Sequence, residues 1–321
     1  MGKRFWGTKS RFPAVFRGFF VSLKLKKYPL KKNGRNQHCV MEISPLAVFW
    51  VHNIDPFVIK FPPNPIIEGI RWYGIAYLLG FVVAACLLNF YHKKGRLSLN
   101  SDQQITLLTS LFIGVLVGGR LGYVLFYDLQ NALQHPGLLI NFHGGGIRGM
   151  SSHGGFIGVI LAALWFSKRA RIAPLQLGDA LVTLAPPGLL FGRIANFING
   201  ELWGRITDVP WAVIFPQSCP YLNYPQELIP ARHPSQLYEA ALEGLLLLIF
   251  TQWRFWKKPK SQTPGRLCGE FFIAYGLVRI FVECFREPDA PLIAALTRGQ
   301  FYSIFIILTG IFFIFISREK R

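Results

Sequence analysis

Long apolar segments constrain this chain more than any other feature of its sequence. A window of about 19 residues, enough for a helix to cross a bilayer, identifies seven of them. They cover approximately residues 70–90, 105–126, 152–167, 177–198, 235–253, 267–285 and 300–317. Only 16% of the chain is charged, against about 25% in soluble domains. We predict an all-α, polytopic membrane protein with about seven transmembrane helices.

The positive charges between these segments predict the orientation. Lys and Arg cluster in alternate connections, at residues 93–96, 168–171 and 254–266, and again in the tail at 318–321. The other connections carry isolated arginines. Because basic residues concentrate on the cytoplasmic side, we expect the C-terminus in the cytoplasm and the N-terminus outside. The position of the Lys and Arg residues in these connections indicates that they contact a bilayer surface rather than nucleic acid, despite a net charge of +19.

The first 40 residues form a separate basic extension. They hold eleven Lys and Arg and no Asp or Glu, which is unexpected for an outer segment. Our hypothesis is that translation begins at Met41; otherwise residues 1–40 are a disordered basic arm. We expect residues 41–321 to form one seven-helix domain with an outer-face loop around 199–234.

Charged residues within the apolar segments need a reason, since each costs roughly 2.5–3.5 kcal/mol near mid-bilayer. Tyr275, Arg279 and Glu283 fall along one face of the predicted helix 267–285, and Arg286 continues that face at the end of the helix. An Arg279–Glu283 ion pair would explain two of them structurally. Further arginines remain in or near the segments, and an excess of guanidinium over carboxylate favours an anion. Phosphate matches the guanidinium fork.

Two other segments carry polar residues of interest. Arg193 and Asn196 share a face of the predicted helix 177–198, which ends in an Asn-Gly turn. His153 lies at the start of segment 152–167. A histidine at a helix start is often a satisfied interfacial residue, but its pKa near neutrality makes His153 the available base. The five cysteines form no CxxC pair, and we predict no metal site.

Several motifs resemble one known family. They are RWYG at 71–74, GGRLGY at 118–123, SHGGFIG at 152–158, GRIANFINGELWGR at 192–205, ARHPSQLYE at 231–239 and YGLVRIFVECFREPD at 275–289. In this order they are similar to the prolipoprotein diacylglyceryl transferases, over about residues 65–315.

The resemblance implies a multi-pass enzyme of the bacterial inner membrane, with residues 41–321 as its catalytic domain. Such an enzyme moves the diacylglyceryl group of phosphatidylglycerol onto the lipobox cysteine of a prolipoprotein signal peptide. The products are a thioether and glycerol phosphate, and the step is the first in lipoprotein maturation. The expected partners are phosphatidylglycerol, prolipoprotein signal peptides and the lipid bilayer. No cofactor is implied.

The resemblance also implies roles for individual residues. Arg193 and Arg279 would bind the phosphate and stabilise its growing charge, and His153 would be the base for a thiol whose ordinary pKa is about 8.5. Tyr275 would complete the catalytic set. The remaining substrate-binding residues would be Tyr73, Asn196, Glu201, Gly204, Glu283 and Arg286.

Two other functions compete with transfer. Intramembrane arginines, proline-containing helices and glycine-rich segments also suit a transporter or flippase for an anionic solute or lipid. Such proteins usually contain repeats, whereas the polar motifs here do not resemble one another. A structural subunit that binds anionic lipid is the other alternative, but it leaves His153 and Glu201 without a purpose.

Overall fold

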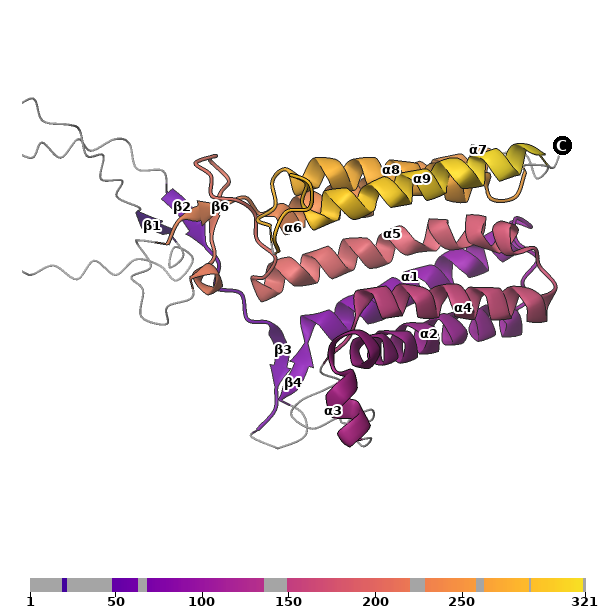
Figure 1. The fold of residues 1–321 in the computed structure, drawn as a ribbon, viewed down its shortest axis with the longest axis horizontal. Helices are drawn as coiled ribbons and strands as arrows, with labels where there is room; N and C mark the ends of the chain where they lie inside the picture. The colour runs from indigo at the N-terminus through magenta and orange to yellow at the C-terminus, as the bar shows by residue number, and fades with distance from the viewer. Residues whose placement is uncertain are drawn as a thin grey trace, which may run out of the picture.

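Parallel and antiparallel helices form one bundle in the computed structural model, which describes residues 19–21, 48–62, 68–135, 149–219, 229–257, 263–288 and 290–319 (Figure 1). A helix occupies each predicted apolar segment. The helices are α1 (Trp72–Lys93), α2 (Ser101–Tyr127), α4 (Ser152–Ala170), α5 (Pro174–Asn199), α6 (Ser235–Glu239), α7 (Leu247–Lys257), α8 (Arg266–Glu283) and α9 (Arg298–Glu319). A π-helical turn, Ala240–Leu246, joins α6 to α7.

Four of the described helices are long and apolar enough to cross a membrane by themselves: α1, α2, α5 and α9. The protein is thus mostly helical and has the character of a membrane protein. Helices α4, α8 and the run from α6 to α7 lack that length or apolarity.

Short strands at one end of the bundle correct the all-α prediction. The strands β1 (Phe19–Val21), β2 (Val48–Val51), β5 (Val213–Ile214) and β6 (Ala231–Arg232) form a sheet in the order β1-β2-β5-β6. The β2–β5 pair is parallel and the other two pairs are antiparallel. Extended segments outside the helices satisfy their backbone groups by pairing, which apolar periodicity does not reveal. The rest of residues 1–40 lies outside the described residues.

A second, two-stranded sheet leads into the bundle. Strand β3 (Phe57–Lys60) pairs antiparallel with β4 (Gly69–Arg71), and α1 begins at the next residue. A six-residue helix, α3 (Leu129–Gln134), follows α2 at the same end of the molecule (Figure 1). We call this end of the bundle, with both sheets, the head end.

Glycines bring α2 and α4 into backbone contact. Gly114, Gly118 and Gly122 of α2 face Gly154 and Gly158 of α4, as expected of a small-residue ridge. A Cβ atom at Gly158 would lie 1.9 Å from the carbonyl oxygen of Gly114, and one at Gly154 would lie 2.2 Å from that of Gly118. Gly154 is therefore used for helix packing.

The clustered basic residues gather at the end opposite the strands, which we call the basic end. Helices α1, α4, α7 and α9 all run toward it (Figure 1). Their last turns carry Lys93, Lys168, Arg169, Arg254 and Lys257. The alternation of strongly and weakly basic connections along the sequence thus corresponds to a difference in positive charge between the two ends of one bundle.

Candidate active site

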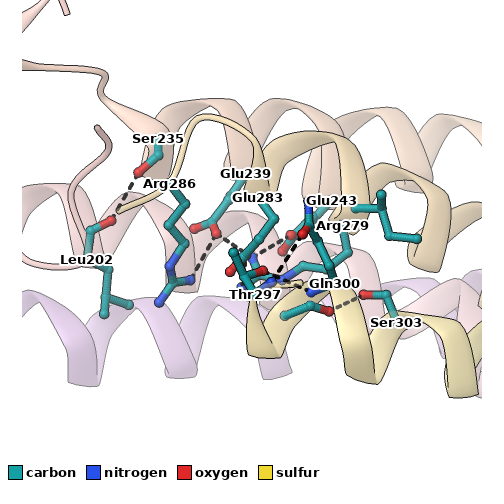
Figure 2. Close-up of polar contacts among 12 residues, drawn as sticks. Leu202, Ser235, Glu239, Glu243, Arg279, Glu283, Arg286, Thr297, Gln300 and Ser303 are labelled. Carbon is teal, nitrogen blue, oxygen red and sulfur yellow. Dashed lines mark hydrogen bonds and ion pairs between the residues drawn. The ribbon is translucent and has the colours of Figure 1, made fainter. Parts of the chain in front are cut away.

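Three arginines and three glutamates meet where α5, α6 and α8 come together, and we call them the arginine–glutamate cluster. Figure 2 labels its three glutamates together with Arg279 and Arg286. Its members are Arg193 of α5, Glu239 of α6, Glu243 of the π-helical turn, Arg279 and Glu283 of α8, and Arg286 just beyond α8. The side chains of Glu239 and Glu243 are fully buried. Those of Arg193 and Arg279 keep 17% and 13% of their surface exposed.

Arg193 is held by both buried glutamates. Its Nε and Nη2 atoms donate to Glu243 Oε2 at 3.2 and 2.9 Å. Its Nη1 atom lies 3.1 Å from Glu239 Oε2. The guanidinium plane is therefore fixed from two sides.

Arg279 contacts all three carboxylates. Its Nη1 donates to Glu239 Oε1 and, at 3.0 Å, to Glu243 Oε1, while Nη2 lies 3.0 Å from Glu283 Oε2. Arg286 Nη1 donates to the same Glu239 oxygen at 3.1 Å. Glu239 thus binds every arginine of the cluster, and the ion pair expected between Arg279 and Glu283 is present.

The prediction that arginines outnumber carboxylates is wrong for this cluster. Glu239 and Glu243 balance the count, so three guanidinium groups face three carboxylates. Arg120 lies apart, where its Nη1 donates to the carbonyl oxygen of Gly149 at 3.2 Å.

The sequence did contain a signal for Glu239 and Glu243, the two carboxylates that the sequence analysis did not include in the site. Glu239 and Glu243 are four residues apart within an apolar segment, where an acidic residue needs a partner. The structure adds a second sign, because Glu243 lies in the π-helical turn and such turns are frequent at functional sites.

A second polar group joins the start of α1 to the end of α5. The Tyr73 hydroxyl donates to Glu201 Oε1, which also accepts from Asn196 Nδ2 at 2.9 Å. Asn196 is three residues after Arg193 on α5, so this group and the cluster share a helix. Gly200, with φ +64°, ends that helix and turns the chain toward Glu201. The structure therefore brings three predicted residues together.

Gly204 lies in a tight backbone passage. A Cβ atom there would lie 2.5 Å from the carbonyl oxygen of His233 and 2.6 Å from that of Phe285. The Gly204 backbone also forms a β-bridge with Arg286. This glycine thus connects the loop that follows α5 to the cluster through backbone contacts, and any side chain would separate them.

His153 and Tyr275 lie outside both hydrogen-bonded groups. The exposed ring of His153 meets Tyr302 of α9 edge-on, with 5.8 Å between the ring centroids. Tyr275 stacks on Phe271, one turn before Arg279. Residues of α9 come close to the cluster, since a Cβ atom at Gly299 would lie 2.6 Å from the Glu283 carboxyl carbon. Helix α9 therefore contacts both His153 and Glu283.

No group of His, Cys, Asp or Glu side chains within the described ranges could hold a metal ion.

Comparison with known proteins identifies relatives over most of the chain. The family model described as prolipoprotein diacylglyceryl transferase matches residues 64–316. A phosphatidylglycerol–prolipoprotein diacylglyceryl transferase of Roseobacter denitrificans is 44% identical over 271 residues, covering 78% of this chain and 91% of the relative. Those of Legionella pneumophila and Rhizobium meliloti are 42% and 41% identical, covering 81% and 85% of this chain and 95% and 96% of the relatives.

Proposed function

The chain belongs to the prolipoprotein diacylglyceryl transferase family, and we propose how its residues transfer a diacylglyceryl group from phosphatidylglycerol to a prolipoprotein. The match over residues 64–316 carries this function, and the resemblance seen in the sequence is confirmed. The transporter or flippase alternative is not favoured, because relatives over most of the chain are named as transferases.

In the proposed reaction, the sulfur of a lipobox cysteine attacks the glycerol carbon that carries the phosphate. A carbon–sulfur bond forms and the carbon–oxygen bond to phosphate breaks. The leaving group is glycerol phosphate, and the thiol proton passes to a base. Charge grows on the phosphate oxygens, so donors aimed at them would lower the barrier.

Arg193 and Arg279 would supply those donors. A guanidinium has five N–H groups, and the contacts with Glu239, Glu243 and Glu283 use only some of them. Both side chains keep some exposed surface, 17% and 13%, and we propose that their remaining N–H groups face the phosphate. The buried carboxylates would therefore act as positioning residues that hold two arginines ready for a phosphate.

The remaining predicted residues would act around this pair. Tyr73, Asn196 and Glu201 would bind the lipid headgroup at the end of α5. Tyr275 would reach the headgroup from α8, and Arg286 would orient Arg279 through their shared partner Glu239. Gly204 would keep the loop that follows α5 against Arg286.

His153 is proposed as the base that accepts the thiol proton. Its exposed position at the start of α4 would allow an incoming peptide to approach. A His153→Gln variant should lose most transfer in membranes. Near wild-type transfer by that variant, alongside an inactive Arg193→Ala, would contradict the base role and leave His153 a positioning residue.

The proposed setting is the bacterial inner membrane, crossed seven times, with the N-terminus outside and the C-terminus cytoplasmic. The basic end of the bundle would face the cytoplasm, which places the cluster toward the outer side. Alkaline phosphatase, which is active only outside the cytoplasm, would be fused after residue 208 and after residue 321. Activity at 208 and none at 321 is expected, and the reverse pattern would overturn the orientation.

The decisive assay uses labelled phosphatidylglycerol and a synthetic lipobox peptide in membranes. Label on the peptide cysteine with the wild type is the expected result. A peptide in which serine replaces that cysteine is the control and should stay unlabelled. No transfer by folded wild-type protein would contradict the proposed function.

A further inference from the structure

A hollow of about 430 Å³ lies where the four-stranded sheet meets α5 and α6. Its lining is largely apolar, and we call it the aromatic groove. Trp50 of β2, Phe197 of α5, Trp211, and Leu237 and Tyr238 of α6 line it, together with nearby prolines. Its volume is within the range of binding pockets, about 300–1,000 Å³.

The aromatic groove adjoins the candidate active site through two helices. On α5, Phe197 of the groove follows Asn196 of the polar group. On α6, Tyr238 of the groove precedes Glu239 of the arginine–glutamate cluster. A ligand in the groove would therefore lie close to a substrate bound at the cluster.

The groove presents apolar surface to solvent at the head end. Trp211 and Leu237 are 61% and 39% exposed. The Trp211 indole nitrogen donates to the Tyr238 hydroxyl at 2.6 Å, and the same hydroxyl lies 3.2 Å from His233 Nδ1. Because these polar atoms already have partners, the ring faces are left for apolar contacts. Exposed aromatic rings with satisfied polar atoms are typical anchors of an interface.

We infer that the aromatic groove binds the apolar segment of a prolipoprotein signal peptide beside its acceptor cysteine; this inference rests on the proposed function. A signal peptide carries 7–15 apolar residues followed by small ones. Where that segment leaves the bilayer its side chains meet water, so burial in the groove stabilises the complex. The acyl chains of the lipid donor gain nothing comparable, because the bilayer core is already apolar.

The test measures peptide binding apart from transfer. A fluorescent signal peptide with serine in place of the acceptor cysteine is titrated with full-length protein in detergent micelles, and its anisotropy reports binding. Trp211→Ala should weaken binding at least about tenfold, as expected for an aromatic anchor. Trp253→Ala is the matched control, since Trp253 is 49% exposed on α7 near the basic end. It should change binding less than about twofold.

The inference would be overturned if the wild type did not bind the peptide, or if the two tryptophan variants weakened binding equally. It would also be overturned if Trp211→Ala left peptide binding unchanged but raised the KM for phosphatidylglycerol. The last result would assign the groove to the lipid. If the wild type binds the peptide through Trp211 but transfers no label, the groove stands and the proposed function fails.

Discussion

Two groups of charged side chains in the helix bundle are organised in different ways. Near the basic end, Asp179 accepts hydrogen bonds from the backbone amides of Gly265 and Cys268 at 2.9 and 2.7 Å. It thereby satisfies one amide just before α8 and one in the first turn of that helix. Glu270 there forms a two-point contact with Arg254 at 2.8 and 2.6 Å. These charges connect helices.

The arginine–glutamate cluster is organised differently. Each of its arginines meets carboxylates from another helix, and Glu239 is shared by Arg193, Arg279 and Arg286. Such sharing holds the guanidinium groups of Arg193 and Arg279 from several sides. The comparison teaches that the two groups differ in connectivity: Glu270 contacts Arg254 and the nearby Arg266, whereas Glu239 joins three arginines that lie on α5, on α8 and just beyond α8.

The largest expected effect is a difference in transfer rate between variants of the two charged groups. Arg193→Ala removes a proposed phosphate ligand and should lower the transfer rate at least about 100-fold, as loss of one preorganised donor does. Arg254→Ala removes an arginine near the basic end and should keep transfer within about tenfold of wild type. Both are measured by label transfer to a lipobox peptide, normalised to folded protein. Equal losses would remove the functional distinction between the groups.

The next effect concerns stability within the cluster. Glu239→Gln leaves three arginines around two carboxylates, and breaking such a buried pair costs about 3–5 kcal/mol. Glu287→Gln, which alters an exposed partner of Arg232, should cost about 0–1 kcal/mol. The two shifts in Tm are compared in detergent micelles. Similar shifts would mean that Glu239 does not hold the cluster.

A smaller effect tests the charges near the basic end. Asp179→Asn keeps the side-chain size but loses one acceptor oxygen and the negative charge. Its stability should fall by about 1.5–3 kcal/mol, with transfer per folded molecule nearly unchanged. Tm and label transfer measured on one preparation check this. A selective loss of transfer would place Asp179 in the catalytic group.

The smallest effect is expected in the four-stranded sheet. Burial among Trp50, Phe197 and Phe215 lowers the pKa of His52 below its ordinary 6.5. The folded state therefore resists protonation, so its stability is full above about pH 6.5 and declines as the pH falls. The free energy of unfolding should therefore be lower at pH 5.5 than at pH 7.5. Amide protection in β2, compared at pH 7.5 and 5.5, should fall in the wild type and change less in His52→Leu. Equal pH dependence in both would contradict it.

The segment pattern was predictable from sequence, and so were several residues that the structure brings together in the candidate site. Apolar runs locate helices without tertiary information, because an unpaired backbone in lipid is so costly. The motifs pointed to Arg193, Asn196, Glu201 and Arg279 before any geometry was known. The strands at the head end were missed, since two-residue strands such as β5 carry no periodic signal.

By itself, the sequence determined a helical membrane protein of this family, because apolar length and motif identity are properties of the chain. Only the tertiary structure decided which charges meet. Glu239 and Glu243 reach Arg193 and Arg279 because three helices converge, and a coulombic contact depends on distance in space rather than along the chain. The balance of three arginines and three glutamates, and with it the number of donors left for a phosphate, is therefore a result of packing.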